Sequence, residues 1–222
     1  MLNALFNPEN KFWMFVAKVA DMFFLQLLWL ICCLPVVTAG ASTAALWKCM
    51  VLMAKDREGK IANDFFGAFR KSFRTATLVW LTQLAAALFL GLDAFACLRM
   101  TKAGQYPQVM MFVLGVVAVL AVAVVIVSFW TYPLAGVYTH FGWKKVLGNS
   151  VFLTLRHLPH TLSCTLLMIS AFVVCYYFPK IWMLLPILVC YLCAKVAVWV
   201  FSHYPNPSDE TEAPEWAEGG SE

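Results

Sequence analysis

Long runs of apolar residues, separated by short polar segments, dominate the pattern of this chain. The runs cover Phe12–Val37, Thr75–Leu98, Gln108–Tyr132, Leu158–Phe178 and Ile181–His203. Each run has about 20 residues or more, and a helix of that length crosses a hydrocarbon core of about 30 Å. The pattern therefore predicts an all-α polytopic membrane helix bundle with about five transmembrane helices, flanked by aromatic residues such as Trp130 near the predicted ends.

The first run and the segment after it allow more than one interpretation. Pro35 is expected to end the first span. A cleavable signal peptide is the alternative, but Asp21 lies directly before the apolar core and further spans follow. Residues Ala39–Ala54 could form a sixth span. Their short length, with Lys48 near the middle, favours a short re-entrant or interfacial helix instead.

Composition and charge exclude the commonest soluble classes. Of 222 residues, 62% are hydrophobic and only 13% are charged, so a soluble core of this size could not bury the apolar surface. The net charge of +4 conceals a basic body and an acidic end. We expect one transmembrane domain over residues 1–204 and a disordered acidic tail over 205–222. Nothing in the sequence indicates nucleic-acid binding.

The distribution of Lys and Arg predicts the orientation. The segments Gly40–Arg74 and Pro133–His157 lie on the same side of a five-span arrangement and hold ten basic residues, against five on the opposite side. The positive-inside rule then places these loops in the cytoplasm of a bacterial plasma membrane. In that arrangement the N-terminus is outside and the acidic tail is inside.

A basic amphipathic helix is predicted over Asn63–Arg74, with Asn63 as its cap and Asp64 in its first turn. One face is predicted to carry three aromatic side chains, and basic groups flank it. A second basic segment follows Pro133. The candidate partner- or lipid-binding residues are Phe66, Phe69, Arg70, Lys71, Phe73, Arg74, Lys144, Lys145 and Arg156. Anchoring to anionic lipid and docking of a partner are both compatible with this pattern.

Four polar residues fall inside predicted spans: Gln26, Gln83, Asp93 and Lys195. Because such groups are costly in lipid, they are candidates for a substrate path. The structural alternative is helix–helix hydrogen bonding for the amides and pairing of Asp93 with Arg99, or of Asp21 with Lys18, for the charges. We favour the structural alternative.

Motifs for catalysis, cofactors or metals are absent from the sequence, so we expect a protein that is not an enzyme, without cofactor or metal. The eight cysteines lie mostly in apolar stretches and are expected to be free thiols. Cys190 and Cys193 have the spacing of a redox or zinc pair but have no second pair nearby. A parallel internal repeat of residues 12–98 and 108–178 is an open possibility, because both halves share the order span, proline, basic segment, span.

Several motifs resemble the YesL-like family of small bacterial integral membrane proteins, long described as a domain of unknown function. They are Phe6-Asn7-Pro8-Glu9-Asn10, Leu34-Pro35-Val36-Val37-Thr38-Ala39-Gly40, Ala44-Ala45-Leu46 and the segment Phe65–Thr77. The sequence departs from the family pattern at Gln26 and Ser72, where the family tends toward Asn. Members are found mostly in Gram-positive bacteria, often beside carbohydrate ABC importers and two-component sensors.

The resemblance implies an uptake-linked accessory protein. Our first hypothesis is a non-catalytic membrane accessory protein whose partners are the lipid bilayer and the permease subunits of an ABC-type carbohydrate importer. The second is a stand-alone small transporter or channel. An intramembrane enzyme is a distant third, because no nucleophile or base pair stands out.

Overall fold

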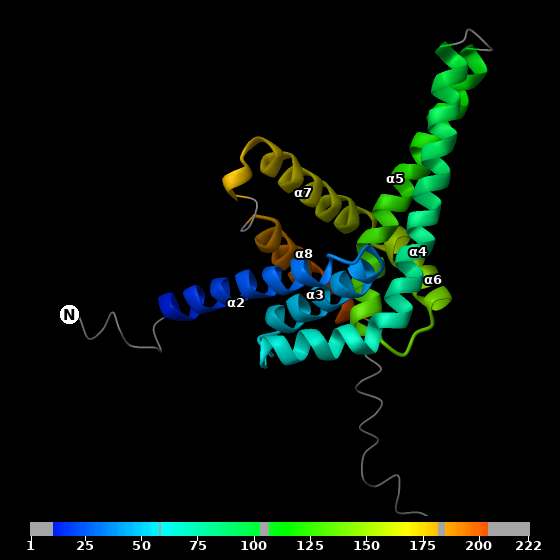
Figure 1. Ribbon diagram of the computed structural model, residues 1–222. Helices are drawn as coiled ribbons and strands as arrows, with labels where there is room; N and C mark the ends of the chain where they lie inside the picture. Colours follow the sequence, from blue (N-terminus) through cyan, green and yellow to red (C-terminus); the bar gives the residue numbers. More distant parts are fainter. Residues whose placement is uncertain (1–10, 58, 103–106, 182–184, 204–222) are drawn as a thin grey trace, which may run out of the picture.

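The computed structural model describes residues 11–57, 59–102, 107–181 and 185–203, and over these ranges the fold is all helical (Figure 1). The α-helices are α2 (Lys11–Cys32), α3 (Ala39–Ala54), α4 (Ile61–Lys102), α5 (Pro107–Val137), α6 (Trp143–Arg156), α7 (Leu158–Tyr177) and α8 (Leu185–Phe201). Two short 3₁₀ turns, η1 (Val36–Thr38) and η2 (Pro179–Ile181), complete the described elements. The predicted all-α helix bundle is confirmed.

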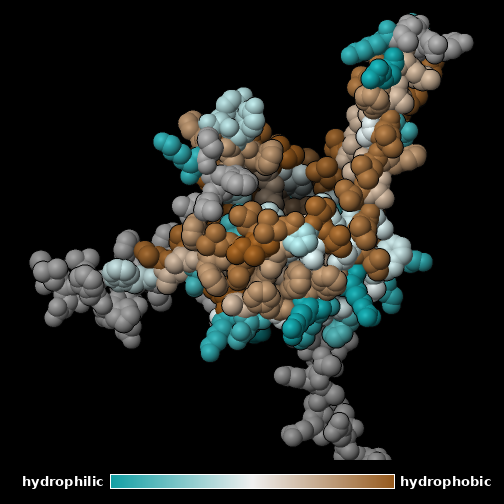
Figure 2. All heavy atoms as spheres, in the orientation of Figure 1, coloured by the Kyte–Doolittle hydropathy of each residue, from teal (hydrophilic) through white to brown (hydrophobic). Residues whose placement is uncertain are grey.

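Four helical stretches in the described ranges are long and apolar enough to cross a membrane. They are Val36–Ala54, Ile61–Lys102, Gln108–Val137 and Leu158–Tyr177. Apolar side chains cover the upper parts of α4, α5 and α7 (Figure 2). Leu92, Phe112 and Phe172 are 68%, 76% and 73% exposed, as expected for side chains that face lipid. The protein is a membrane protein built of apolar helices.

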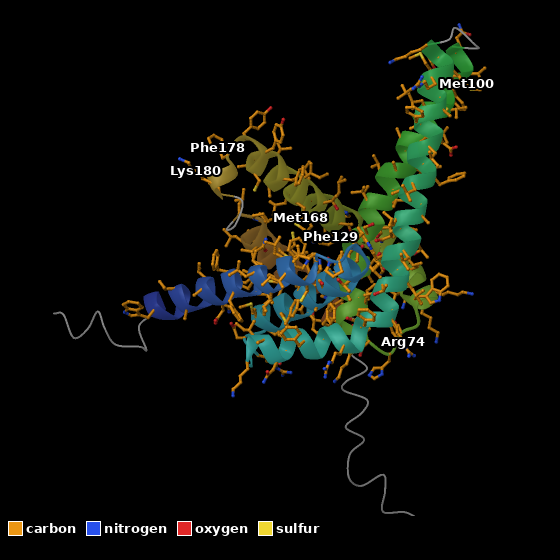
Figure 3. All side chains as sticks on the ribbon, viewed as in Figure 1. Arg74, Met100, Phe129, Met168, Phe178 and Lys180 are labelled. Carbon is orange, nitrogen blue, oxygen red and sulfur yellow. The ribbon has the colours of Figure 1, made fainter. Side chains whose placement is uncertain are left out.

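Helix α4 unites two elements that the sequence predicted separately. Its first part runs along the base of the molecule, and the helix then turns and rises (Figure 1). Arg74 lies at this corner (Figure 3). The buried Ser72 donates its hydroxyl to the carbonyl of Ala68 at 2.8 Å, a type of bond that often bends helices. The helix predicted over residues 63–74 is present, but it continues into the second predicted span as one helix.

The cap predicted for this helix is wrong. The helix begins at Ile61, so Asn63 lies inside its first turn. The carboxylate of Asp64 accepts a hydrogen bond from the backbone N–H of Gly59 at 3.1 Å. The negative charge of Asp64 therefore lies at the positive end of the helix dipole, as expected. Its carboxylate also binds the backbone of Gly59, just before the helix begins.

Proline does not end α5. The sequence predicted a span that stops at Tyr132, but the helix continues through the buried Pro133 to Val137. Membrane helices tolerate proline because neighbouring groups satisfy the backbone that it frees. The first span is shorter than predicted at its end, because α2 stops at Cys32. The last predicted span ends two residues early, because α8 stops at Phe201, and residues 182–184 near its predicted start lie outside the described residues.

Helix α3 lies at the centre of the bundle, in contact with α4, α5 and α8. It has the bounds predicted for the short helix after the first span. Two glycines allow its neighbours to approach. A Cβ at Gly40 would lie 2.5 Å from the Trp80 Cβ of α4, and one at Gly136 of α5 would overlap the carbonyl oxygen of Ala44. Because its small side chains are buried against protein, α3 is a core helix.

Candidate functional site on the basic face

A row of three neighbouring aromatic rings lies along the inner side of the first part of α4. Phe65 and Phe69 stack with their centroids 6.4 Å apart, and Phe69 and Phe73 are 5.5 Å apart. Phe65 is fully buried in the core, whereas Phe66 is 46% exposed. Of the two neighbouring rings, Phe65 therefore enters the core and Phe66 stays near the surface. The apolar face packs on protein, and the polar face turns outward.

Helix α6 is a second amphipathic helix on the same end of the molecule. Its buried side is formed by Val146, Ser150, Leu153 and Thr154. The corner of α4 and the segment before α6 lie side by side, since the Thr75 hydroxyl reaches the carbonyl of Phe141 at 3.4 Å. The sequence predicted that both basic segments share one side, and the structure brings them together.

Five exposed cations, which we call the basic face, result from this packing: Arg70, Lys71, Arg74, Lys144 and Lys145. Hydrophilic residues gather along this lower edge of the molecule (Figure 2). Arg156 lies at the far end of α6, with its guanidinium 5.9 Å from the centroid of the Phe152 ring. The basic face offers fixed positive charge to an acidic protein surface or to anionic head groups.

One of the predicted intramembrane polar residues joins two helices. The Gln83 side-chain oxygen of α4 accepts a hydrogen bond from the Tyr132 hydroxyl of α5 at 2.6 Å. Gln83 also lines an open groove of about 540 Å³ between α4, α5 and α6, whose other walls are mainly apolar. Gln26 and Asp93 are half-buried, and no hydrogen bond or ion pair connects Asp93 to Arg99. The guanidinium of Arg99 instead lies 5.0 Å from the Phe95 ring.

Lys195 is exposed and belongs to a small charged cluster. Its ammonium lies 5.2 Å from the centroid of the Tyr191 ring, and the ammonium of Lys18 lies 5.5 Å from the same ring. Lys18 forms an ion pair with Asp56 at 2.7 Å, so the expected pairing with Asp21 is not observed. The hydrogen bond and the charge of Lys18 lower the pKa of Asp56. The five-span arrangement puts Lys18 and Asp56 on opposite sides of the membrane, whereas their side chains are in contact in the structure.

Sequence reasoning missed a buried hydrogen bond and an aromatic cluster. The Trp130 indole N–H donates to the Thr161 hydroxyl at 2.7 Å, and both side chains are fully buried. Trp130, which the sequence pattern assigns to the aromatic residues near the span ends, is thus buried inside the bundle. His160 stacks on Trp199 with their centroids 5.1 Å apart, and His203 lies 4.9 Å from the same ring. The first two of these contacts form between helices that are distant in the sequence, so the sequence pattern alone could not predict them.

The cysteines are free thiols, as expected, and six of the eight are buried. Cys190 and Cys193 lie within the packed core of α8, and the Cys193 thiol points to the carbonyl of Cys164 at 3.9 Å. This environment is typical of cysteine as a small apolar side chain.

The fold and its surface define a polytopic helical membrane protein with a basic end. Within the chain, residues 22–94 match a family model described as "Protein of unknown function, DUF624". The match covers the second half of α2, all of α3 and most of α4, and it confirms the resemblance to the YesL-like family over that part. No curated protein and no solved structure matches the chain.

Proposed function

We propose that the protein is a non-catalytic accessory protein of the membrane, which docks onto the permease subunits of an ABC-type carbohydrate importer through the basic face. The observation that carries this proposal is the position of two amphipathic helices side by side, with their cations outward and their apolar sides on the core. The kind of partner comes from the YesL-like resemblance.

The support for docking is that both helices that carry these cations bury their inner sides in the protein. The cations of α4 belong to a helix whose inner side carries the neighbouring rings of Phe65, Phe69 and Phe73. The cations of α6 belong to a helix whose inner side is buried. A preorganised set of charges binds a partner with less ordering cost than flexible chains would. The same charges steer an acidic surface toward the protein.

A stand-alone transporter or channel is the second candidate. The groove beside Gln83 favours it, because a polar group there faces an otherwise apolar wall. Transport requires a path of polar groups along the groove, and the described walls offer mainly apolar side chains. The accessory role therefore stays the first proposal.

A pull-down from native membranes in mild detergent, followed by mass spectrometry, tests the proposal. We expect the tagged protein to recover a permease pair in stoichiometric amount. Recovery of the protein alone would overturn the accessory role, and uptake by the purified protein in liposomes would then be measured.

Two matched variants test the basic face. Arg70→Gln/Lys71→Gln/Arg74→Gln removes three exposed charges from the base of α4, and Arg99→Gln/Lys102→Gln removes two from its opposite end. We expect the first to reduce permease recovery about tenfold, which equals a loss of about 1.4 kcal/mol in binding. The second should leave recovery unchanged. Equal recovery by both variants would exclude the basic face as the docking surface.

A further inference from the structure

We infer that α2 and α3 form a re-entrant hairpin, which enters the membrane from the side of the basic face, inserts its apolar turn among lipid chains and returns to the same side. Both termini then lie on one side of the membrane. Helices α4, α5, α7 and α8 make the crossings.

A hydrogen bond near the turn and an ion pair at the open end join the two helices of the hairpin. Near the turn, the Trp29 indole N–H of α2 donates to the Thr43 hydroxyl of α3 at 3.2 Å. At the open end, Lys18 pairs with Asp56 just after α3. The two helices are therefore antiparallel, and the beginning of α2 lies level with the end of α3.

The turn presents apolar side chains and no charge. Leu34, Val36 and Val37 are 79%, 64% and 54% exposed. Between Asp21 and Lys48 the sequence contains no Asp, Glu, Lys or Arg. A turn at an aqueous surface would place these side chains in water, whereas a turn within lipid gives them an apolar solvent.

Two backbone carbonyls at the turn have hydrogen-bond partners within the hairpin, which lowers their cost in lipid. The carbonyl of Cys32, left over at the end of α2, accepts hydrogen bonds from the hydroxyls of Thr38 at 2.7 Å and Ser42 at 3.0 Å. The carbonyl of Pro35 accepts two hydrogen bonds from Thr38, one from the hydroxyl at 2.8 Å and one from the backbone N–H at 3.0 Å. Pro35 itself has no N–H to satisfy. Each unsatisfied group would cost several kcal/mol in hydrocarbon.

The depth of the turn can be measured along α4. Gly40, at the start of α3, lies against Ala76 and Trp80. Trp80 is six residues beyond Arg74, or about 9 Å of helix, whereas α4 extends about 33 Å further to Lys102. In Figure 1, α2 and α3 run sideways while the α4–α5 pair rises well beyond them. A turn at this depth lies inside a core of about 30 Å and does not reach its far surface.

The balance of positive charge agrees with this topology. When α2 is taken as a full span, ten basic residues lie on one side and five on the other. When the hairpin returns, Lys11 and Lys18 join the larger group and the balance becomes twelve to three. The positive-inside rule then places the basic face and both termini in the cytoplasm. This replaces the outside N-terminus expected from the sequence.

Sealed membrane vesicles of both orientations provide the test for the termini. Tags at the N- and C-terminus should both be digested by protease in inside-out vesicles and both be protected in right-side-out vesicles. Digestion of the N-terminal tag only in right-side-out vesicles would overturn the inference.

Thiol labelling tests the depth of the turn. Leu34→Cys, with Val36→Cys as a second variant, is treated with a membrane-impermeant maleimide, and added label relative to the parent protein is counted by mass. We expect no added label from either side in sealed vesicles and one added label after unfolding in SDS. The control Arg57→Cys, at the exposed base of the hairpin, should gain one label in inside-out vesicles. Label added to Leu34→Cys in right-side-out vesicles would mean that α2 crosses the membrane fully. Label added in inside-out vesicles would mean that the turn lies on the cytoplasmic surface. Either result would overturn the inference.

Discussion

Replacement of Gly136 by alanine should destabilise the protein, although alanine is the better helix former. Gly136 lies where α5 meets α3, and a Cβ there would overlap the backbone carbonyl of Ala44. Because that neighbour is backbone, it cannot rotate away as a flexible side chain could. The two helices must separate instead, and α3 loses part of its packing.

The magnitude follows from two opposing terms. Overpacking of a well-packed core costs about 1–3 kcal/mol. The better helix propensity of alanine increases the free energy of unfolding by up to about 1 kcal/mol. We therefore expect a net loss of about 1–2 kcal/mol for Gly136→Ala. For a chain of this size, each kcal/mol shifts Tm by about 2–4 °C, so Tm should fall by about 2–8 °C.

The matched control is Gly115→Ala, in the same helix. Gly115 has no heavy atom within 4 Å of the position a Cβ would take. Its replacement should leave Tm unchanged or raise it. The assay is thermal unfolding of the detergent-purified protein, followed by intrinsic tryptophan fluorescence. A Tm for Gly136→Ala equal to or above that of the parent would refute the assigned contact between α3 and α5.

Two further predictions concern hydrogen bonds and pH. Thr161→Val leaves the buried Trp130 indole N–H without its acceptor and should cost about 1–3 kcal/mol in the unfolding assay, whereas Ser163→Ala at an exposed site should have little effect; equal effects would contradict the role of the bond. Asp56 has a pKa lowered by Lys18, so its small stabilising effect is present at neutral pH and is lost as the pH falls through that lowered pKa. The Tm of the parent should therefore exceed that of Asp56→Asn at pH 7, and the two should converge as the pH falls through the lowered pKa of Asp56. A difference that stays constant as the carboxyl is protonated would argue against the ion pair.

The sequence predicted which segments are helical far better than where the helices end. Apolar runs of about 20 residues reveal membrane helices because length and composition suffice. Proline misled the prediction at Pro133, since in a membrane bundle the neighbours compensate for the lost hydrogen bond. The corner of α4 also escaped notice, because it depends on the buried Ser72 and on packing with Gly40.

The basic residues of the candidate site were predicted, but their setting was not. Charge pattern alone predicted Arg70, Arg74 and Lys144 on one side of the membrane, and all three are exposed in the structure, on segments that meet where Thr75 donates to Phe141. The same pattern could not distinguish Phe65 from Phe66 as the buried ring, because both neighbours are apolar and only tertiary packing decides. The partner of Lys18 was beyond sequence reasoning for a similar reason, as Asp56 is distant in the chain.

The central position of α3 has a consequence for biosynthesis. Ribosomes deliver α3 before α4, α5 and α8, the helices that bury it. During synthesis the small apolar residues of α3 and Lys48 therefore lack the helices that contact them in the finished fold. The core is complete only after α8, the last of the described helices, has been synthesised. Chains truncated before Leu185 should consequently leave α3 open to quality-control proteases, even though every residue of α3 itself is present.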